Sequence, residues 1–208
     1  MKYFVTAIGT DSGKTVVSAI LCEALGADYW KPIQSGLPRD TDTVRALLSR
    51  NDTTFHPERF LLQLPASPHA AARAENVTIK LGDFTLPSTD RPLVIEGAGG
   101  VLVPLNERDL MIDLIIHLDA EVVLVSNHYL GSINHTLLTA EALRQRRIPV
   151  RGIVFNGMPN EDTERVILHQ TGLPCLLRVA KEERIDKTAI TKYATLLRNT
   201  LHGTSTEH

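Results

Sequence analysis

The chain has 208 residues, of which 43% are hydrophobic and 22% are charged, and its formal net charge at pH 7 is −2. This size and composition fit a globular α/β domain with a substantial core. The charge gives no basic field that would attract nucleic acid or an anionic membrane, so neither is an expected partner. The sequence lacks an apolar run of the roughly 20 residues that span a bilayer and lacks a signal-peptide pattern. Its two cysteines are far apart, which favours a reducing, cytoplasmic location.

Strand-like and helical runs alternate along the chain. The strand-like runs are Tyr3–Ile8, Asp28–Lys31, Pro92–Glu96, Glu121–Ser126, Val150–Phe155 and Pro174–Val179. The runs with helical apolar spacing are Gly13–Leu25, Thr41–Leu48, Leu110–Leu118, Ile133–Arg146, Glu161–Thr171 and Lys187–Leu201. This alternation predicts an α/β fold with a mostly parallel sheet and helices on both faces. We expect one domain over residues 1–201, loops and short helices over 50–90, and a disordered tail over 202–208.

The first strand-like run ends in a glycine-rich turn, Gly9–Thr15, which opens a helix. Backbone N–H groups of such a turn bind phosphate, Lys14 can reach the outer phosphates, and the Thr15 hydroxyl can bind Mg²⁺. Ile8 stands where the standard P-loop spacing has its first glycine, so the turn is a variant. Its position between strand and helix nevertheless predicts a nucleoside triphosphate site in a P-loop NTPase-like domain.

The second strand-like run leads into the segment Lys31–Gly36, which reads Lys-Pro-Ile-Gln-Ser-Gly. The proline stiffens this turn and the last glycine lets it bend. Because ligands of such sheets bind beyond the carboxyl ends of the strands, Lys31 and Ser35 are expected near the phosphate loop. An ordinary polar surface loop is the alternative.

Three residues, Asp40, Thr41 and Asp42, lie at the start of the next helical run. Either Asp40 or Thr41 could cap this helix, with Asp42 in its first turn, where a carboxylate is favourable. Alternatively, Asp42 is a ligand of Mg²⁺. The local sequence leaves both interpretations open.

The third strand-like run ends in Glu96 and continues into a turn, Gly97-Ala98-Gly99-Gly100. A carboxylate at this place suits a nucleotide-bound Mg²⁺, which it would coordinate directly or through water. The glycines let the backbone approach a substrate or a phosphate closely. A solvated glutamate before a loose turn is the alternative.

Three other turns also carry candidate residues. Ser67 and Pro68 fit the N-cap and first position of a helix, while a role for His69 is undecided. The turn Leu130–Thr136 opens another helix, whose free N–H groups could bind a carboxylate unless Ser132 simply caps it. Asn156 follows a strand-like run, where its amide could meet a purine edge or belong to an ordinary turn.

These blocks, in this order, resemble the dethiobiotin synthetase family, ATP-dependent carboxylases of the biotin pathway. The resemblance covers Met1 to about Asn156. Its motifs are Gly9–Thr15, Lys31–Gly36, Asp42, Ser67–His69, Glu96–Gly100, Gly131–His135 and Asn156. The family's own loop carries the same extra residue, which accounts for the irregular P-loop spacing. Ala7 and Ile8 stand where relatives often have Gly-Thr.

The resemblance implies a reaction in three stages. Carbon dioxide adds to an amine of 7,8-diaminopelargonate and gives a carbamate. The carbamate oxygen attacks the γ-phosphate of ATP and gives a mixed carbamic–phosphoric anhydride. The neighbouring amine then closes the ureido ring, which yields dethiobiotin, ADP and phosphate.

The resemblance also implies roles for individual residues. The catalytic residues would be Lys31, Lys14 and Thr10. The ATP-binding residues would be Asp11, Ser12, Gly13, Lys14, Thr15, Val16, Asp42, Glu96, Gly97, Ala98, Gly99 and Asn156. The Mg²⁺ ligands would be Thr15, Asp42 and Glu96. The substrate-binding residues would be Ser35, Gly97, Gly100, Gly131 and Asn134, with Gly131–Asn134 facing the other subunit's site in a homodimer.

One segment departs from the family, and other functions stay open. Relatives often carry a Gly-x-Ile-Pro-type segment for adenine where this chain has Leu177–Glu182, so nucleotide selectivity could differ. A related amide-forming ligase is one alternative, although such chains usually add a glutaminase domain with a nucleophilic cysteine. A partition or metallocluster-assembly switch is another, although it usually has an extra lysine early in the loop. A non-catalytic nucleotide-binding module is the third.

Overall fold

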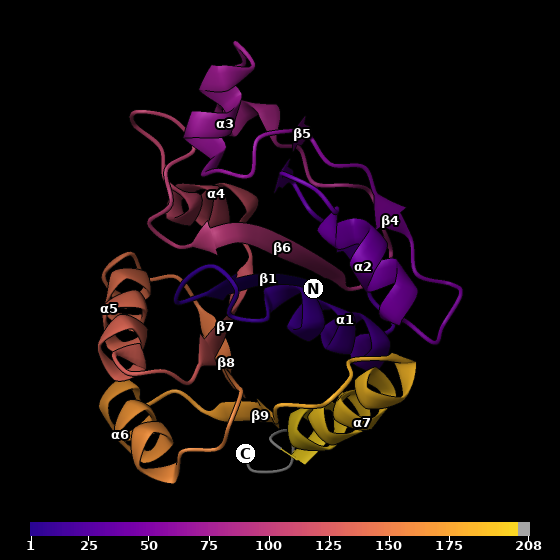
Figure 1. Ribbon diagram of the computed structural model, residues 1–208, viewed down its shortest axis with the longest axis vertical. Coiled ribbons are helices and arrows are strands. Elements are labelled where there is room, and N and C mark those ends of the chain that lie inside the picture. Colours follow the sequence, from indigo (N-terminus) through magenta and orange to yellow (C-terminus); the bar gives the residue numbers. More distant parts are fainter. Residues whose placement is uncertain (204–208) are drawn as a thin grey trace.

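The computed structural model describes residues 1–203, with side chains described through residue 201. Within this part of the chain, seven strands form one sheet in the order β4-β2-β6-β1-β7-β8-β9 (Figure 1). They are β1 (Lys2–Ala7), β2 (Asp28–Trp30), β4 (Phe55–His56), β6 (Leu93–Gly100), β7 (Glu121–Asn127), β8 (Val150–Asn156) and β9 (Cys175–Val179). Neighbouring strands of this sheet run parallel. Two short strands, β3 (Ile33–Ser35) and β5 (Phe60–Leu62), pair separately and are also parallel.

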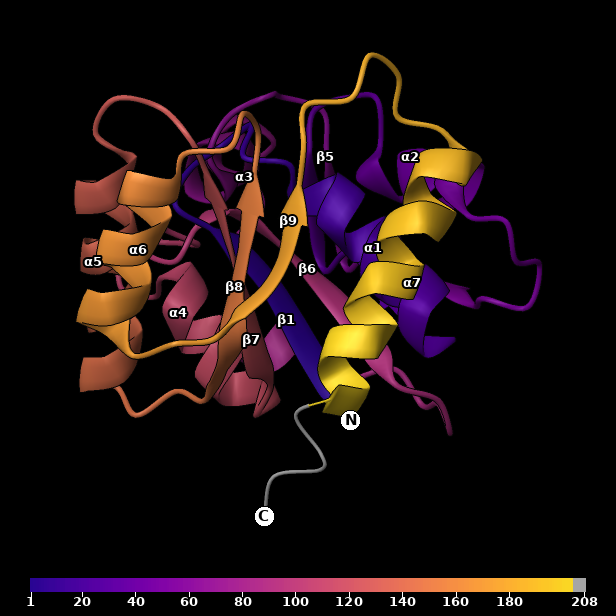
Figure 2. The same ribbon diagram turned by 90° about the horizontal axis from the view of Figure 1, so that it is seen from below.

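Helices cover both faces of the large sheet, as the sequence predicts. Figure 2 shows α1, α2 and α7 on one side of the strands and α4, α5 and α6 on the other. The helices are α1 (Lys14–Leu25), α2 (Asp40–Leu47), α3 (Pro68–Ala74), α4 (Met111–Leu118), α5 (Ser132–Gln145), α6 (Glu161–Thr171) and α7 (Lys187–Gly203), with a 3₁₀ turn η1 (Leu81–Asp83). The predicted P-loop NTPase-like α/β fold is therefore confirmed. Among the described residues, none of the helices has the length and apolar character to cross a membrane.

The central strands carry continuous apolar runs because each of them supplies two cores. In β7, Val122 and Leu124 belong to the core under α4 and α5, while Val123 and Val125 belong to the core under α1 and α7. Side chains of a strand alternate between the faces of a sheet, so a strand covered on both faces has no polar side. Burial of these apolar surfaces holds the helices against the sheet.

The structure differs from the predicted elements mainly at short pairings. It has strands of two or three residues at β4 and β5, where loops and short helices are expected from the sequence, and at β3, where a turn is expected. Such strands exist because of a partner distant in the chain rather than because of their own pattern. The last helix continues to Gly203, two residues beyond its predicted end at Leu201, and the rest of the predicted tail, residues 204–208, lies outside the described part.

Strand β1 lies between β6 and β7, and this arrangement positions the site. The chain goes from β1 to the β2–β6 side of the sheet and then returns past β1 to β7. A crevice opens at such a reversal, beyond the carboxyl ends of the strands. The phosphate loop follows β1 at this edge. The turn predicted at Gly97–Gly100 is wrong, because β6 continues through these residues as strand, and Glu96 lies within β6 beside the loop. Both therefore come to this edge of the sheet (Figure 1).

Candidate active site

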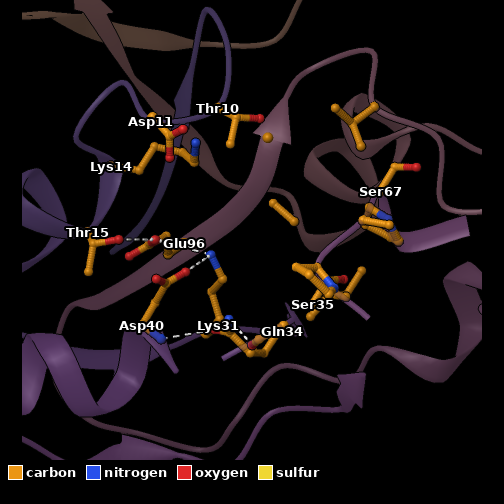
Figure 3. Close-up of a pocket in the computed structure, with 18 of the residues that line it drawn as sticks. Thr10, Asp11, Lys14, Thr15, Lys31, Gln34, Ser35, Asp40, Ser67 and Glu96 are labelled. Carbon is orange, nitrogen blue, oxygen red and sulfur yellow. Dashed lines mark hydrogen bonds and ion pairs between the residues drawn. The ribbon is translucent and has the colours of Figure 1, made fainter. Parts of the chain in front are cut away.

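A cavity of about 690 Å³ opens at this edge of the sheet. Figure 3 shows side chains from the phosphate loop, the end of β2, the start of α2 and the end of β6 turned toward it. Its lining residues are Thr10, Asp11, Ser12, Gly13, Lys14, Thr15, Lys31, Ile33, Gln34, Ser35, Gly36, Leu37, Pro38, Asp40, Pro65, Ala66, Ser67, Pro68, Glu96, Ala98, Gly99 and Val103. The lining combines polar and charged side chains with apolar ones, among them Pro65 and Val103.

The phosphate loop is held in shape by backbone geometry and by one distant amide. Asp11 and Gly13 have positive φ angles of +55° and +90°, and the helix α1 follows without a side-chain cap. Its first N–H groups are therefore available to an anion. Asn156 Nδ2 donates a hydrogen bond to the Ser12 carbonyl at 2.9 Å, and a Cβ at Gly13 would collide with this amide.

Lys14 lies folded back on its own loop. Its Nζ donates to the Gly9 carbonyl at 3.2 Å, and the residue is only 8% exposed. Burial lowers the pKa of Lys14, and the neighbouring positive charge of Lys31 lowers it further. An anion in the cavity would relieve both effects, so Lys14 is placed to receive phosphate.

Lys31 is the centre of a buried ionic cluster at the ends of β2 and β6. Its Nζ lies 3.1 Å from Glu96 Oε1, 2.6 Å from Asp40 Oδ2 and 3.1 Å from the Gly97 carbonyl oxygen. Burial lowers the pKa of Lys31, but the two carboxylates outweigh burial and raise the pKa above its ordinary value. Lys31 is therefore charged at neutral pH.

The Glu96 carboxylate is fully buried and accepts hydrogen bonds on both oxygens. Thr15 Oγ1 donates to Oε1 at 3.0 Å, beside Lys31, and the Tyr29 phenol donates to Oε2 at 3.0 Å. Thr15 and Glu96 thus bring a hydroxyl and a carboxylate together, which are hard oxygen donors of the kind that Mg²⁺ prefers. This donor set, next to a phosphate loop, fits a nucleotide-bound Mg²⁺.

Asp40, and not Asp42, is the carboxylate that α2 directs into the cavity. The Asp42 carboxylate is held outside by two hydrogen bonds from Arg39, at 2.8 and 2.9 Å. Two positions along a helix correspond to about 200° of rotation, so the two side chains leave α2 on opposite sides. Gln34 Oε1 accepts the Asp40 N–H at 3.0 Å and fixes the start of the helix. The structure therefore does not support Asp42 as a ligand, and it does not use Asp40 as a side-chain cap.

The other predicted residues lie at different distances from the cavity. Thr10, Asp11, Ser12, Gly13, Lys14, Thr15, Lys31, Ser35, Glu96, Ala98 and Gly99 line it, while Val16, Asp42, Gly97, Gly100, Gly131, Asn134 and Asn156 do not. Gly97 reaches it indirectly, since its carbonyl accepts from Lys31, and Asn156 contacts the phosphate loop. Asn134 lines a separate cavity between α5 and α6. Ser35 Oγ is buried and has no hydrogen-bond partner in the described chain, which leaves it available to a ligand.

Two turns away from the phosphate loop match their predicted helix caps only in part. Ser67 is the N-cap of α3 with Pro68 at its first position, but Ser67 Oγ lies 3.0 Å from His69 Nδ1 and does not bond to the helix backbone. His69 lines another cavity, next to Arg73 and Lys80. At α5, Gly131 with a φ of +106° is the N-cap, so Ser132 is not the cap.

Sequence reasoning missed two residues of the ionic cluster, Tyr29 and the inward-facing Asp40. The alternation of a strand contains a signal for the first, because Tyr29 and Lys31 are two positions apart and so face the same side of the sheet. No local signal separates Asp40 from Asp42, because both are carboxylates in the first turn of one helix.

Comparison with known proteins shows the family of the chain. The chain is 59% identical over 198 residues to the ATP-dependent dethiobiotin synthetase BioD of Cytophaga hutchinsonii, covering 94% of this chain and 96% of that protein. It is 46% identical over 202 residues to the BioD protein of Christiangramia forsetii, covering 96% of this chain and 97% of that protein. The chain belongs to the dethiobiotin synthetase family. The family is one of ligases, and a sequence family described as an AAA domain also matches residues 1–189.

Solved structures similar to this dethiobiotin synthetase family member belong to more distant ATPases. One is the septum site-determining protein MinD of Pyrococcus horikoshii, complexed with Mg-ADP, with a TM-score of 0.59, 14% identity and full coverage of both chains. Another is a ParA family ATPase of Chlorobium tepidum, with a TM-score of 0.58, 11% identity and coverage of 100% and 99%. At this identity the similarity shows the fold alone, and the family assignment depends on the closer relatives.

Proposed function

We propose that this protein uses ATP and Mg²⁺ to carboxylate 7,8-diaminopelargonate with CO₂ and to close the ureido ring of dethiobiotin, releasing ADP and phosphate. The observation that supports it best is the pair of buried lysines, Lys14 and Lys31, at one cavity. A nucleotide-binding protein needs the first lysine. The second, held among carboxylates beside the unpaired Ser35 hydroxyl, is the additional cation that a carbamate requires.

The chemical difficulty of the reaction is the approach of two anions, a carbamate and a triphosphate. Backbone N–H groups of Asp11–Val16 bind the phosphates, and Lys14 exchanges its bond to Gly9 for one to the outer phosphates. Lys31 keeps its position at the end of β2 and donates to the carbamate oxygen that attacks phosphorus. Both ammonium groups neutralise charge that develops during transfer, which is the main contribution a protein makes to phosphoryl transfer.

Thr15 and Glu96 would hold Mg²⁺, which when bound neutralises charge on the β- and γ-phosphates. For the second carboxylate we propose Asp40 in place of Asp42, because its side chain faces the cavity and contacts Lys31. Thr10, at the rim of the loop, is proposed to contact the transferred phosphoryl group. These residues position the reactants and do not form covalent bonds with them.

The diamine would lie at the other end of the cavity. Ser35 and the Gly97–Gly100 segment are proposed to contact its amines, next to the apolar lining residues Pro65 and Val103. The carboxylate of the substrate would be received by Gly131 and Asn134 of a second subunit in a homodimer. The fully exposed Leu130 beside Gly131 supports a covered surface there. For the base, we propose that Asn156 Oδ1 accepts from adenine while Nδ2 holds the loop.

Mass spectrometry of a complete reaction tests the proposal. Purified protein is incubated with diaminopelargonate, bicarbonate and Mg-ATP, and we expect ADP together with a product that has gained one carbonyl group. Mixtures without the diamine or without bicarbonate are the controls, and a nucleotide switch would hydrolyse ATP equally in all of them. Folded, ATP-binding protein that forms no carbonylated product would refute the assignment.

A further inference from the structure

Tyr29 is a fully buried tyrosine whose hydroxyl points to the nucleotide end of the sheet. It lies in the middle of β2, paired in register with Val94 of β6, and its ring packs against Phe55 with centroids 5.8 Å apart. The phenol donates to Glu96 Oε2 at 3.0 Å, and this bond is buried. The proposed reaction gives this hydroxyl no direct contact with substrate or nucleotide.

The two oxygens of Glu96 have different kinds of partner. Oε1 accepts from Thr15 and Lys31, both of which line the cavity and would exchange partners when a ligand binds. Oε2 accepts from Tyr29, which is fixed in the strand and lies outside the cavity lining. A buried carboxylate needs donors at both oxygens. The Tyr29 bond is therefore the one that remains when Oε1 changes partner.

We infer that Tyr29 is the positioning residue of Glu96, holding Oε2 so that Oε1 faces the metal of a bound Mg-nucleotide. The inference rests on the proposed function, since it assumes that Glu96 serves Mg²⁺. Without the phenol, the carboxylate is free to turn its unpaired oxygen toward Lys31, and it then presents Mg²⁺ with a different geometry. Loss of a residue that orients a metal ligand typically costs about 10–100-fold in metal affinity.

The test is the Mg²⁺ dependence of ADP binding to the full chain, measured by calorimetry for the wild type and for Tyr29→Phe. We expect Tyr29→Phe to weaken Mg²⁺ binding to the ADP complex by about tenfold, while ADP affinity in EDTA stays unchanged. Tyr3→Phe is the matched control. Tyr3 is a buried tyrosine near the start of β1, at the opposite end from the phosphate loop, and its hydroxyl donates to the Met1 sulfur. It should leave both affinities unchanged.

A second variant separates positioning from a loss of stability. In a Glu96→Gln background, Tyr29→Phe should have no further effect on Mg²⁺ affinity if the phenol acts through Glu96. A phenol that served packing alone would instead change the thermal midpoint in this background as well. Wild-type-like Mg²⁺ dependence in Tyr29→Phe, or an equal loss of ADP affinity with and without metal, overturns the inference. If wild-type ADP binding shows no dependence on Mg²⁺, the metal assignment of the proposed function fails and the inference falls with it.

Discussion

Replacing Lys31 by methionine tests the buried ionic cluster most directly. Methionine keeps much of the volume of the side chain and removes the ammonium group that donates to Glu96, Asp40 and the Gly97 carbonyl. The Glu96 side chain is 0% exposed and would be left with only the hydroxyls of Thr15 and Tyr29. The variant therefore leaves a buried carboxylate without its counter-charge.

The size of the effect follows from the burial of the two carboxylates. Removing one partner of a buried ion pair costs about 3–5 kcal/mol. The Asp40 side chain is 31% exposed and can be hydrated in the variant, so the loss of its ion pair with Lys31 costs little. The Glu96 side chain is not exposed and cannot be hydrated in this way. We expect Lys31→Met to lower the free energy of unfolding by about 3 kcal/mol, at the lower end of that range.

Urea unfolding followed by tryptophan fluorescence measures this change. Trp30 is the single tryptophan, is buried and lies next to Lys31, so its emission reports on this end of β2. Circular dichroism checks that the whole fold unfolds in the same transition. Lys2→Met is the control, because Lys2 pairs with Asp119, whose side chain is 96% exposed, and such pairs contribute about 0–1 kcal/mol.

The double variant Lys31→Met/Glu96→Gln supplies the refutation. Neutralising the carboxylate should recover part of the loss, with a coupling energy of at least about 1.5 kcal/mol. Additive losses, or a loss from Lys31→Met below about 1 kcal/mol, would contradict the reasoning from burial.

The pKa of Lys31 is raised on folding. The stabilisation that its charge gives the fold is therefore complete below the unfolded-state pKa of roughly 10.4, and it is lost only as pH rises through the folded-state pKa. The difference between wild type and variant should therefore stay constant from about pH 7 to about pH 9.

Three further variants test the charges at the nucleotide end. Burial and the charge of Lys31 lower the pKa of Lys14, so folding disfavours the charged form of this side chain. Lys14→Met should therefore raise the thermal midpoint of the ligand-free protein at pH 7, while it weakens ATP binding about 10–100-fold. A lower thermal midpoint in this variant would contradict burial and charge repulsion as the cause. Asp40→Asn should weaken Mg²⁺ binding to the ADP complex by about tenfold, whereas Asp42→Asn should change it by less than about twofold. A larger loss of Mg²⁺ affinity in Asp42→Asn than in Asp40→Asn would show that Asp42 is the ligand.

The two helix carboxylates show where sequence reasoning about the site stopped. The local sequence left Asp42 open as a metal ligand or as an ordinary first-turn carboxylate, and the family resemblance selected it as a ligand. In the structure its side chain is held outside the cavity by Arg39. Strand, turn and helix signals are local, and they predicted that the phosphate loop, Lys31 and Glu96 lie close together, as they do around one cavity. The choice between Asp40 and Asp42 depends on the direction in which α2 leaves the Gln34 turn, which the residues of the helix do not specify.

Consecutive residues were enough to predict the alternation of strands and helices, the two-sided burial of the central strands and the phosphate loop between β1 and α1. These features follow from period, apolar content and glycine positions, which are local properties of the chain. The folded chain was needed to establish the short pairings of β3, β4 and β5, the amide of Asn156 on the phosphate loop and the phenol of Tyr29 on Glu96. Each of these joins residues distant in the chain, so their geometry exists only after the sheet has placed them side by side.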